Sequence, residues 1–305
     1  MDLPTTHLLF SLTSSSSSDF LTGDALLFAV LAPALALIVY GGILWNWGGA
    51  HGREEALDVW RRAIVAAALA ASVFIIPAFI GTAIDIYQKA AHPNSTTCIN
   101  ALAIKEPDLQ LSNYAKAVKQ SMDCAAKVFE NATQRIADTY TNLFQSSTVT
   151  GFFGVTSALS MGLFQIALPF SGAASGALLT LTAVKVAAYV AIGFALLAGL
   201  GAALIAMERL QVLGAVIVAG AMAMPPVLAG LADAVSPLIQ KIPEAKGLLG
   251  VLSNLAAWDW GKYVHGTGAV AEITAYAALA LSIMAAATAA ISYALSKVPQ
   301  HLSVE

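Results

Sequence analysis

Long apolar blocks alternate with shorter polar segments along this chain, and the length of the blocks predicts how it folds. A helix needs about 20 apolar residues to cross the hydrocarbon core of a bilayer. Blocks of this kind predict six membrane spans, at residues 25–45, 63–84, 152–170, 178–207, 210–235 and 270–295. The third block contains Gln165 and Pro169. It is therefore either a full span or a re-entrant segment, which leaves five spans as the alternative.

The polar segments divide this all-α, polytopic arrangement into parts. Residues 1–23 form an N-terminal tail, residues 24–87 a two-span hairpin, and residues 88–150 a polar helical segment. Residues 151–305 form a bundle of about four spans. Within it, the small-residue run 171–176 predicts a turn, and the semi-polar segment 236–266 predicts a short helix at the membrane interface.

A long amphipathic helix is predicted inside the polar segment, from Leu111 to about Phe144. Apolar residues recur there at steps of three and four, which places them on one helix face: Leu111, Tyr114, Val118, Met122, Ala125, Phe129, Ala132, Ile136, Tyr140 and Leu143. Charged residues occupy the opposite face, so this helix is too polar to span a bilayer. Its apolar face must pack on lipid, on a partner helix or on the rest of the subunit.

Composition excludes a soluble protein of this length. Hydrophobic residues make up 58% of the 305 residues and charged residues 11%, with a mean hydropathy of +0.75. Soluble domains carry about 25% charged residues. The sequence also lacks phosphate-binding, zinc-protease and nucleophile-elbow motifs. We therefore expect a multi-pass protein of the cell membrane that is not an enzyme and has no catalytic residues, no cofactor and no metal site.

Basic residues predict the orientation of the spans, because they collect in short loops on the cytoplasmic side. Arg53, Arg61 and Arg62 fall in the predicted loop 51–62 and mark it as cytoplasmic. With six spans, the segment 236–266 is then also cytoplasmic. Both termini and residues 88–150 are outside.

Both cysteines and both N-glycosylation sequons support an external position for residues 88–150. Cys98 and Cys124 lie in this segment, together with the sequons at Asn94 and Asn131. Disulfides persist in oxidising spaces, and N-glycans need an external surface. A Cys98–Cys124 disulfide would fasten the loop to the amphipathic helix, and two free thiols are the alternative.

Three ionisable residues fall within or beside the apolar blocks, where a charge is costly. Lys185, Asp233 and Glu272 come to a similar depth, near the cytoplasmic face in the six-span arrangement, so the two carboxylates are candidate partners for the lysine. They form either a gate or polar lining, or a structural pair with a lysine that extends to the interface. Helix breaks are predicted at Pro77 and at the pair Pro225 and Pro226.

The first hairpin resembles a known family. Its sequence runs from Tyr40-Gly-Gly-Ile-Leu through Gly48-Gly49 and a charged turn to Val59-Trp-Arg-Arg-Ala-Ile-Val-Ala-Ala-Ala68. This resembles the two-span hairpins of pilins and channel subunits in conjugation (type IV secretion) machines. The layout of the whole chain is similar to that of TrbL/VirB-type polytopic channel proteins, and the Ala-rich spans with an external disulfide are similar to the CedA-like channel subunits of archaeal DNA import.

The resemblance implies a function and partners. It implies a channel subunit that passes DNA across the membrane, with small two-span membrane subunits, a separate cytoplasmic HerA/VirB-type ATPase and a homo-oligomer as candidate partners besides the lipid bilayer. Two other functions remain open. A self-contained small-solute or ion transporter would use Lys185, Asp233, Glu272 and the Pro225–Pro226 break as its site, and a structural assembly subunit would need none of them.

Overall fold

The structure is a computed structural model, and it describes residues 23–91, 98–102, 111–152, 157–205, 210–244 and 260–302. All regular structure in these ranges is helical. In chain order the elements are α1 (Gly23–Trp47), α2 (Gly49–Ala91), the short 3-10 helix η2 (Cys98–Ala101), α3 (Leu111–Phe152), α4 (Ser157–Ile205), α5 (Gln211–Ile239) and α7 (Trp260–Leu302). The predicted tail 1–23 lies, apart from its last residue, outside the described residues.

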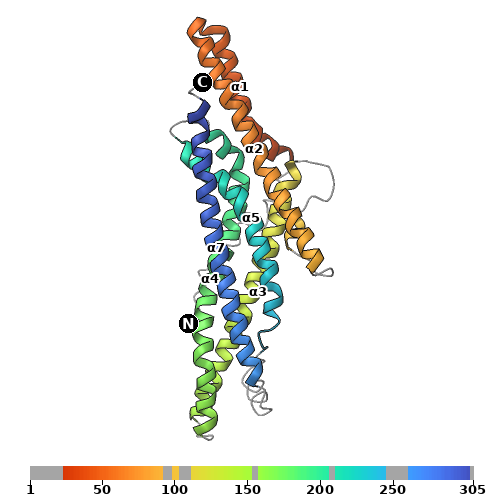
Figure 1. Cartoon of the computed structure of the whole chain (residues 1–305), viewed down its shortest axis with the longest axis vertical. Helices are drawn as coiled ribbons and strands as arrows, with labels where there is room; N and C mark the ends of the chain where they lie inside the picture. Colours follow the sequence, from red (N-terminus) through yellow and green to blue (C-terminus); the bar gives the residue numbers. More distant parts are fainter. Residues whose placement is uncertain are drawn as a thin grey trace.

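Four long helices form an elongated bundle, and a helical hairpin is attached to one end of it (Figure 1). In the bundle, α3 and α5 run in one direction and α4 and α7 in the other. Helix α5 packs against both α4 and α7, and it is the most enclosed of the apolar helices. The hairpin of α1 and α2 extends past the end of the bundle where α4 ends and α5 begins.

Three helices are long and apolar enough to cross a membrane: Phe164–Ala202, Gln211–Ile239 and Gly261–Lys297. A shorter apolar stretch covers Leu35–Trp47. The outer faces of these helices expose large apolar side chains such as Leu179, Leu279 and Val212. Exposed apolar area of this extent is typical of a surface covered by lipid or by another protein. The described fold is therefore consistent with an all-helical membrane protein, and it does not confirm six spans.

The turn predicted at residues 171–176 is wrong, because α4 continues through it without interruption. The Ser171 hydroxyl donates a hydrogen bond to Leu168 O, and the Ser175 hydroxyl donates to Gly172 O. Ala174 and Ala177 are fully enclosed by neighbouring helices. The small residues thus allow close helix packing instead of ending the helix, and the predicted third and fourth spans belong to one helix.

The loop predicted at residues 51–62 is also wrong, because these residues form the first turns of α2. The chain reverses at Gly48 and Gly49, and Gly49 has the left-handed φ of 64° that favours glycine. Arg53, Arg61 and Arg62 are therefore helical residues near the tip of the hairpin. Arg53 lies over the ring of Trp45, and Arg62 pairs with Asp58 at 2.8 Å one turn earlier.

The amphipathic helix is confirmed, and its apolar face packs on the rest of the subunit. Helix α3 extends eight residues beyond the predicted end, to Phe152. The residues of the predicted stripe from position 118 onward are enclosed by the bundle: Val118, Met122, Ala125, Phe129, Ala132, Ile136 and Leu143 are buried, and Tyr140 is half-buried. Of the three predicted surfaces that could cover this stripe, the structure selects α4 and α5 of the same chain.

The predicted proline breaks do not end any helix. Helix α2 continues through Pro77, and α5 continues through Pro225, Pro226 and Pro237. Pro225 and Pro226 are buried. In membrane helices, contacts with neighbouring helices commonly offset the backbone hydrogen bonds that a proline removes.

Candidate functional site

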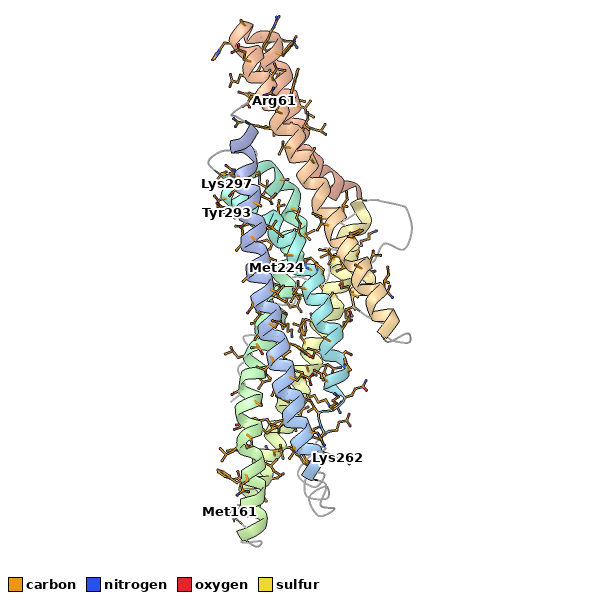
Figure 2. The ribbon with its side chains drawn as sticks, in the orientation of Figure 1. Arg61, Met161, Met224, Lys262, Tyr293 and Lys297 are labelled. Atoms are coloured by element: carbon orange, nitrogen blue, oxygen red, sulfur yellow. A yellow bond between two sulfur atoms is a disulfide. The ribbon has the colours of Figure 1, made fainter. Side chains whose placement is uncertain are left out.

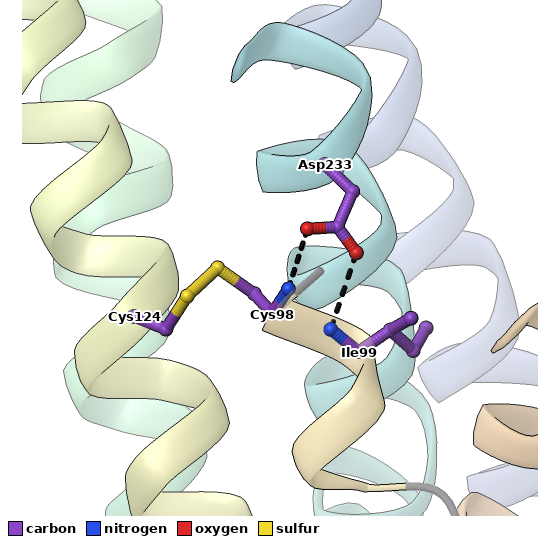
Figure 3. Close-up of a disulfide and its surroundings, with 4 residues drawn as sticks. All are labelled: Cys98, Ile99, Cys124 and Asp233. Atoms are coloured by element: carbon purple, nitrogen blue, oxygen red, sulfur yellow. Dashed lines mark hydrogen bonds between the residues drawn. A yellow bond between two sulfur atoms is a disulfide. The ribbon is translucent and has the colours of Figure 1, made fainter. Parts of the chain in front are cut away.

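One polar site joins η2, α3 and α5 (Figure 3). Cys98 and Cys124 form a disulfide, with Cα atoms 5.5 Å apart, that fastens η2 to α3. Asp233 of α5 accepts two backbone hydrogen bonds from the other side of η2. One comes from Cys98 N to Oδ1 at 2.6 Å, and the other from Ile99 N to Oδ2 at 3.1 Å.

This arrangement satisfies donors that a helix start leaves free. The first N–H groups of a helix have no partner within the helix, and a carboxylate is a favourable acceptor for them. The side chains of Cys98, Ile99 and Leu102 are buried around these bonds. Gly81 of α2 approaches Leu102 so closely that a Cβ on it would lie 3.0 Å from Leu102 Cβ. η2 therefore links α2, α3 and α5 at one point.

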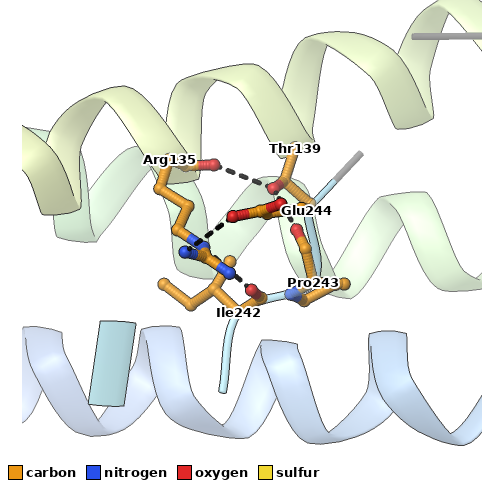
Figure 4. Close-up of polar contacts among 5 residues, drawn as sticks. All are labelled: Arg135, Thr139, Ile242, Pro243 and Glu244. Carbon is orange, nitrogen blue, oxygen red and sulfur yellow. Dashed lines mark hydrogen bonds and ion pairs between the residues drawn. The ribbon is translucent and has the colours of Figure 1, made fainter. Parts of the chain in front are cut away.

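A second polar cluster joins α3 to the chain beyond α5 (Figure 4). Arg135 donates from Nε to Ile242 O at 3.0 Å and lies 3.4 Å from the carboxylate of Glu244. The hydroxyl of Thr139 lies 2.9 Å from Pro243 O and 2.8 Å from Arg135 O. An open cavity of about 870 Å³ adjoins this cluster, with Arg135, Glu244, Lys262, His265 and Glu272 in its lining.

These contacts bear on one part of the predicted orientation. Residues 88–150 and 236–266 were expected on opposite sides of the membrane. Arg135 and Thr139 of the first segment bind the backbone of Ile242 and Pro243 in the second. The two segments therefore meet in the fold, whereas the predicted orientation separates them, and the side of a membrane on which each one lies stays a prediction. Residues 245–259 of the second segment lie outside the described residues.

The three predicted intramembrane charges do not form a common site. Lys185 pairs with Glu130 of α3 at 3.4 Å, and Asp233 binds the backbone of η2. Glu272 accepts a hydrogen bond from the Tyr276 hydroxyl one turn later, at 3.0 Å. The predicted pairing of Lys185 with Asp233 or Glu272 is therefore wrong. The lysine finds its carboxylate on the amphipathic helix, which the sequence placed outside the membrane.

Of the two predicted N-glycosylation sequons, the structure describes the one at Asn131. Asn131 is exposed on the polar face of α3, and Thr133 of the same sequon donates to Phe129 O within the helix. Asn94 lies outside the described residues. Among the described residues, no group of three or more His, Cys, Asp or Glu side chains could hold a metal ion.

Sequence reasoning missed Arg135, Thr139 and Glu130 as contact residues. Arg135 and Thr139 lie at the edge of the apolar stripe on α3, next to the buried Ile136. A polar residue at the edge of a buried stripe is a usable signal, because it is partly enclosed and needs a partner. The sequence gives no indication of which backbone carbonyl it meets.

We expect Asp233→Asn to destabilise the junction by about 1–3 kcal/mol, because an amide nitrogen would replace one acceptor and face a backbone N–H. Thermal unfolding of the purified protein in mild detergent measures the effect. Asp138→Asn, on the exposed face of α3, is the matched control and should leave the unfolding temperature unchanged. Equal effects of the two variants would contradict the assigned role of Asp233.

We expect Lys185→Gln to change stability by less than about 1 kcal/mol, since its pair with Glu130 is partly exposed. Unfolding in detergent and the yield of folded protein test this expectation, with Lys127→Gln on α3 as control. A loss well above that of the control would show that the pair is essential to the fold.

Comparisons of the chain with protein-family models, curated proteins and solved structures find no match. The site is therefore defined by its geometry alone.

Proposed function

We propose that the chain is a membrane channel subunit of a DNA-transfer apparatus that passes DNA across the membrane with a separate ATPase. The proposed cargo rests on the resemblance of the hairpin, from Tyr40 to Ala68, to channel subunits of conjugation machines. The proposal that it works as a subunit rests mainly on the exposed surface of the hairpin. The close packing between α4 and α5 is the second feature that supports it.

The hairpin supports assembly with other membrane chains. It extends past the end of the bundle (Figure 1), and both of its helices expose large apolar side chains. Val39 is 62% exposed, Ile64 68% and Phe79 72%. A surface of this kind is typical of contact with lipid or with other membrane helices. Small two-span subunits are the partners that fit a two-helix surface.

The packing between α4 and α5 favours a path between chains over a path through this chain. A Cβ added to Gly214 would overlap the carbonyl oxygen of Gly201, so the two helix backbones touch. A Cβ on Gly220 would overlap the ring of Phe194. Lys185, Asp233 and Glu272 also bind separate partners, so these three charges do not form the common site that a self-contained transporter was expected to use.

The surface of α3 is an unfavourable candidate for DNA contact. Its exposed face carries Lys116, Lys119 and Lys127 but also Glu130 and Asp138, so the charges nearly cancel. Surfaces that bind DNA are strongly basic. The proposal therefore places DNA along a channel shared among subunits, with the cytoplasmic ATPase near the arginines at the hairpin tip.

Affinity purification from native membranes in mild detergent, with mass spectrometry, tests this proposal. We expect the tagged chain to recover a HerA/VirB-type ATPase and small two-span proteins. The double variant Ile64→Ala and Phe79→Ala should lose most of the two-span proteins. Leu179→Ala, on the exposed face of α4, should retain them, and deletion of the chain should abolish DNA transfer.

The opposite results would overturn the proposal. A pure chain without partners, together with normal DNA transfer in the deletion strain, would exclude a DNA-transfer subunit. Solute flux through vesicles that contain only this chain would then favour the self-contained transporter.

A further inference from the structure

The open cavity beside the Arg135 cluster lies where three parts of the chain meet. Its walls come from α3, from residues 240–244 beyond α5 and from the first part of α7. The segment beyond α5 lies between the other two walls (Figure 4). It contacts α7 so closely that a Cβ on Gly266 would lie 2.6 Å from Pro243 Cδ. In Figure 2, Lys262 of the α7 wall lies toward the end of the molecule opposite Lys297.

The acceptor groups around the cavity already have donors. The carboxylate of Glu244 lies 3.4 Å from the guanidinium of Arg135, and Glu272 accepts from the Tyr276 hydroxyl at 3.0 Å. The backbone carbonyls of residues 242–243 are bound by side chains of α3. No group of three metal-binding side chains occurs in the described part of the chain. A cation in the cavity would therefore compete with these donors.

Two donor side chains in the lining are free. Lys241 and His265 are exposed, and within the described ranges neither side chain makes a hydrogen bond or an ion pair. Lys262 adds a further positive charge to the same lining. The three permanently positive side chains in the lining face only two carboxylates, which leaves one positive charge in excess. A ligand that carries negative charge and accepts hydrogen bonds meets both conditions.

The free donors favour a phosphate group over a carboxylate. A carboxylate pairs best with the planar fork of an arginine. Arg135 already donates to Ile242 O and pairs with Glu244, so its fork is occupied. Lysine presents a compact point charge, which suits the tetrahedral oxygens of a phosphate. A phosphate monoester also carries about −1.5 to −2 charges at pH 7, enough to neutralise the excess.

The cavity has room for more than a phosphate group. Its volume of about 870 Å³ falls in the range of about 300–1,000 Å³ that is typical of sites for small organic molecules. Ile242, Pro243, Val264 and Ala269 give the lining an apolar part. Ile242 and Ala269 are buried, whereas Val264 is exposed. An organic group joined to the phosphate would pack on this apolar part.

We propose that this cavity binds a small organic phosphate, with Lys241, His265 and Lys262 as donors to the phosphate oxygens. The organic part of the ligand lies against Ile242 and Val264. A soluble phosphate ester and the headgroup of an anionic lipid share this chemistry. The site is separate from the hairpin surface, and it does not depend on the cargo proposed above.

Titration calorimetry of the full chain in mild detergent tests the proposal. Two probes are used: glycerol phosphate, a soluble ester, and dioctanoyl phosphatidic acid, a short-chain anionic lipid. We expect saturable binding of at least one probe. The double variant Lys241→Gln and His265→Gln removes both free donors and should raise the Kd of that probe by about tenfold or more. Lys119→Gln with Lys127→Gln removes two positive charges on α3 outside the lining, and it should bind like the wild-type protein.

The probe that binds identifies the source of the phosphate. Binding of glycerol phosphate supports a soluble ester, and binding of phosphatidic acid alone supports a lipid headgroup. The proposal is overturned if neither probe binds at millimolar concentration, or if the cavity variant and the control variant lose affinity equally. Thermal unfolding shows whether both variants are folded, which we expect because all four replaced side chains are exposed. Since DNA and partner proteins are absent from the titration, no outcome decides whether the chain transfers DNA.

Discussion

Replacement of Phe129 by alanine is expected to lower the free energy of unfolding by about 3–5 kcal/mol. Phe129 is fully buried in the middle of α3 and is among the largest enclosed side chains of the described residues. The substitution would leave a cavity between α3 and its neighbours, because α4 and α5 are held together by their own close contacts. Thermal or denaturant unfolding in mild detergent, followed by circular dichroism, measures this change.

Phe144→Ala is the matched control for this substitution. Phe144 lies on the same helix, stacks against Tyr140, and is 53% exposed. Its truncation removes little buried area, so we expect a change below about 1 kcal/mol. If both variants lost the same stability, the apolar face of α3 would not be packed against the bundle in the way described.

Loss of the Cys98–Cys124 disulfide is expected to lower the free energy of unfolding by about 3–4 kcal/mol. The bond closes a loop across 26 positions, and chain-entropy arguments assign roughly this value to such a closure. Among the described contacts, the hydrogen bonds to Asp233 and the buried apolar side chains would still hold η2. Unfolding of the oxidised protein with and without reductant measures the effect.

The double variant Cys98→Ala and Cys124→Ala provides the control. It should unfold like the reduced wild-type protein, and reductant should not change it further. If reductant left the wild-type protein unchanged, the two thiols would not be linked in the folded chain, and the alternative of two free thiols would hold.

The features that could be predicted from the sequence are those that depend on local spacing. The stripe on α3 was recognisable because apolar residues follow the helical repeat from Leu111 to Leu143, and most of its described members are buried. The disulfide could be proposed because the chain has only two cysteines and both fall in one polar segment. In both cases the signal lies within a short part of the chain.

Two wrong predictions, a turn at 171–176 and a loop at 51–62, concern residue types that suit both a chain reversal and a helix. Small residues at 171–176 suit a turn, but they also suit the close packing of a continuous helix, and burial of Ala174 decides for the helix. The charged residues 51–62 are typical of a loop, yet only Gly48 and Gly49 are needed to reverse the chain. Tertiary contacts decide such cases, and local composition does not.

The partners of Lys185 and Asp233 could not be predicted for a further reason. Both contacts join residues far apart in the chain: Asp233 binds backbone groups 135 and 134 positions earlier. The sequence showed that these charges need partners, but it could not show that the polar segment 88–150 would pack along the apolar helices and supply them.

The order in which the ribosome makes the chain determines the order in which the contacts at η2 can form. Cys98 and Cys124 leave the ribosome more than a hundred residues before Asp233. The disulfide can therefore close while α5 has yet to be made, and it then presents the first N–H groups of η2 in a fixed position. Helix α5 then docks onto a surface that η2 and α3 have already formed. In a chain that stops before residue 233, the N–H groups of η2 would lack the carboxylate of Asp233. The junction is therefore complete only after synthesis has reached α5.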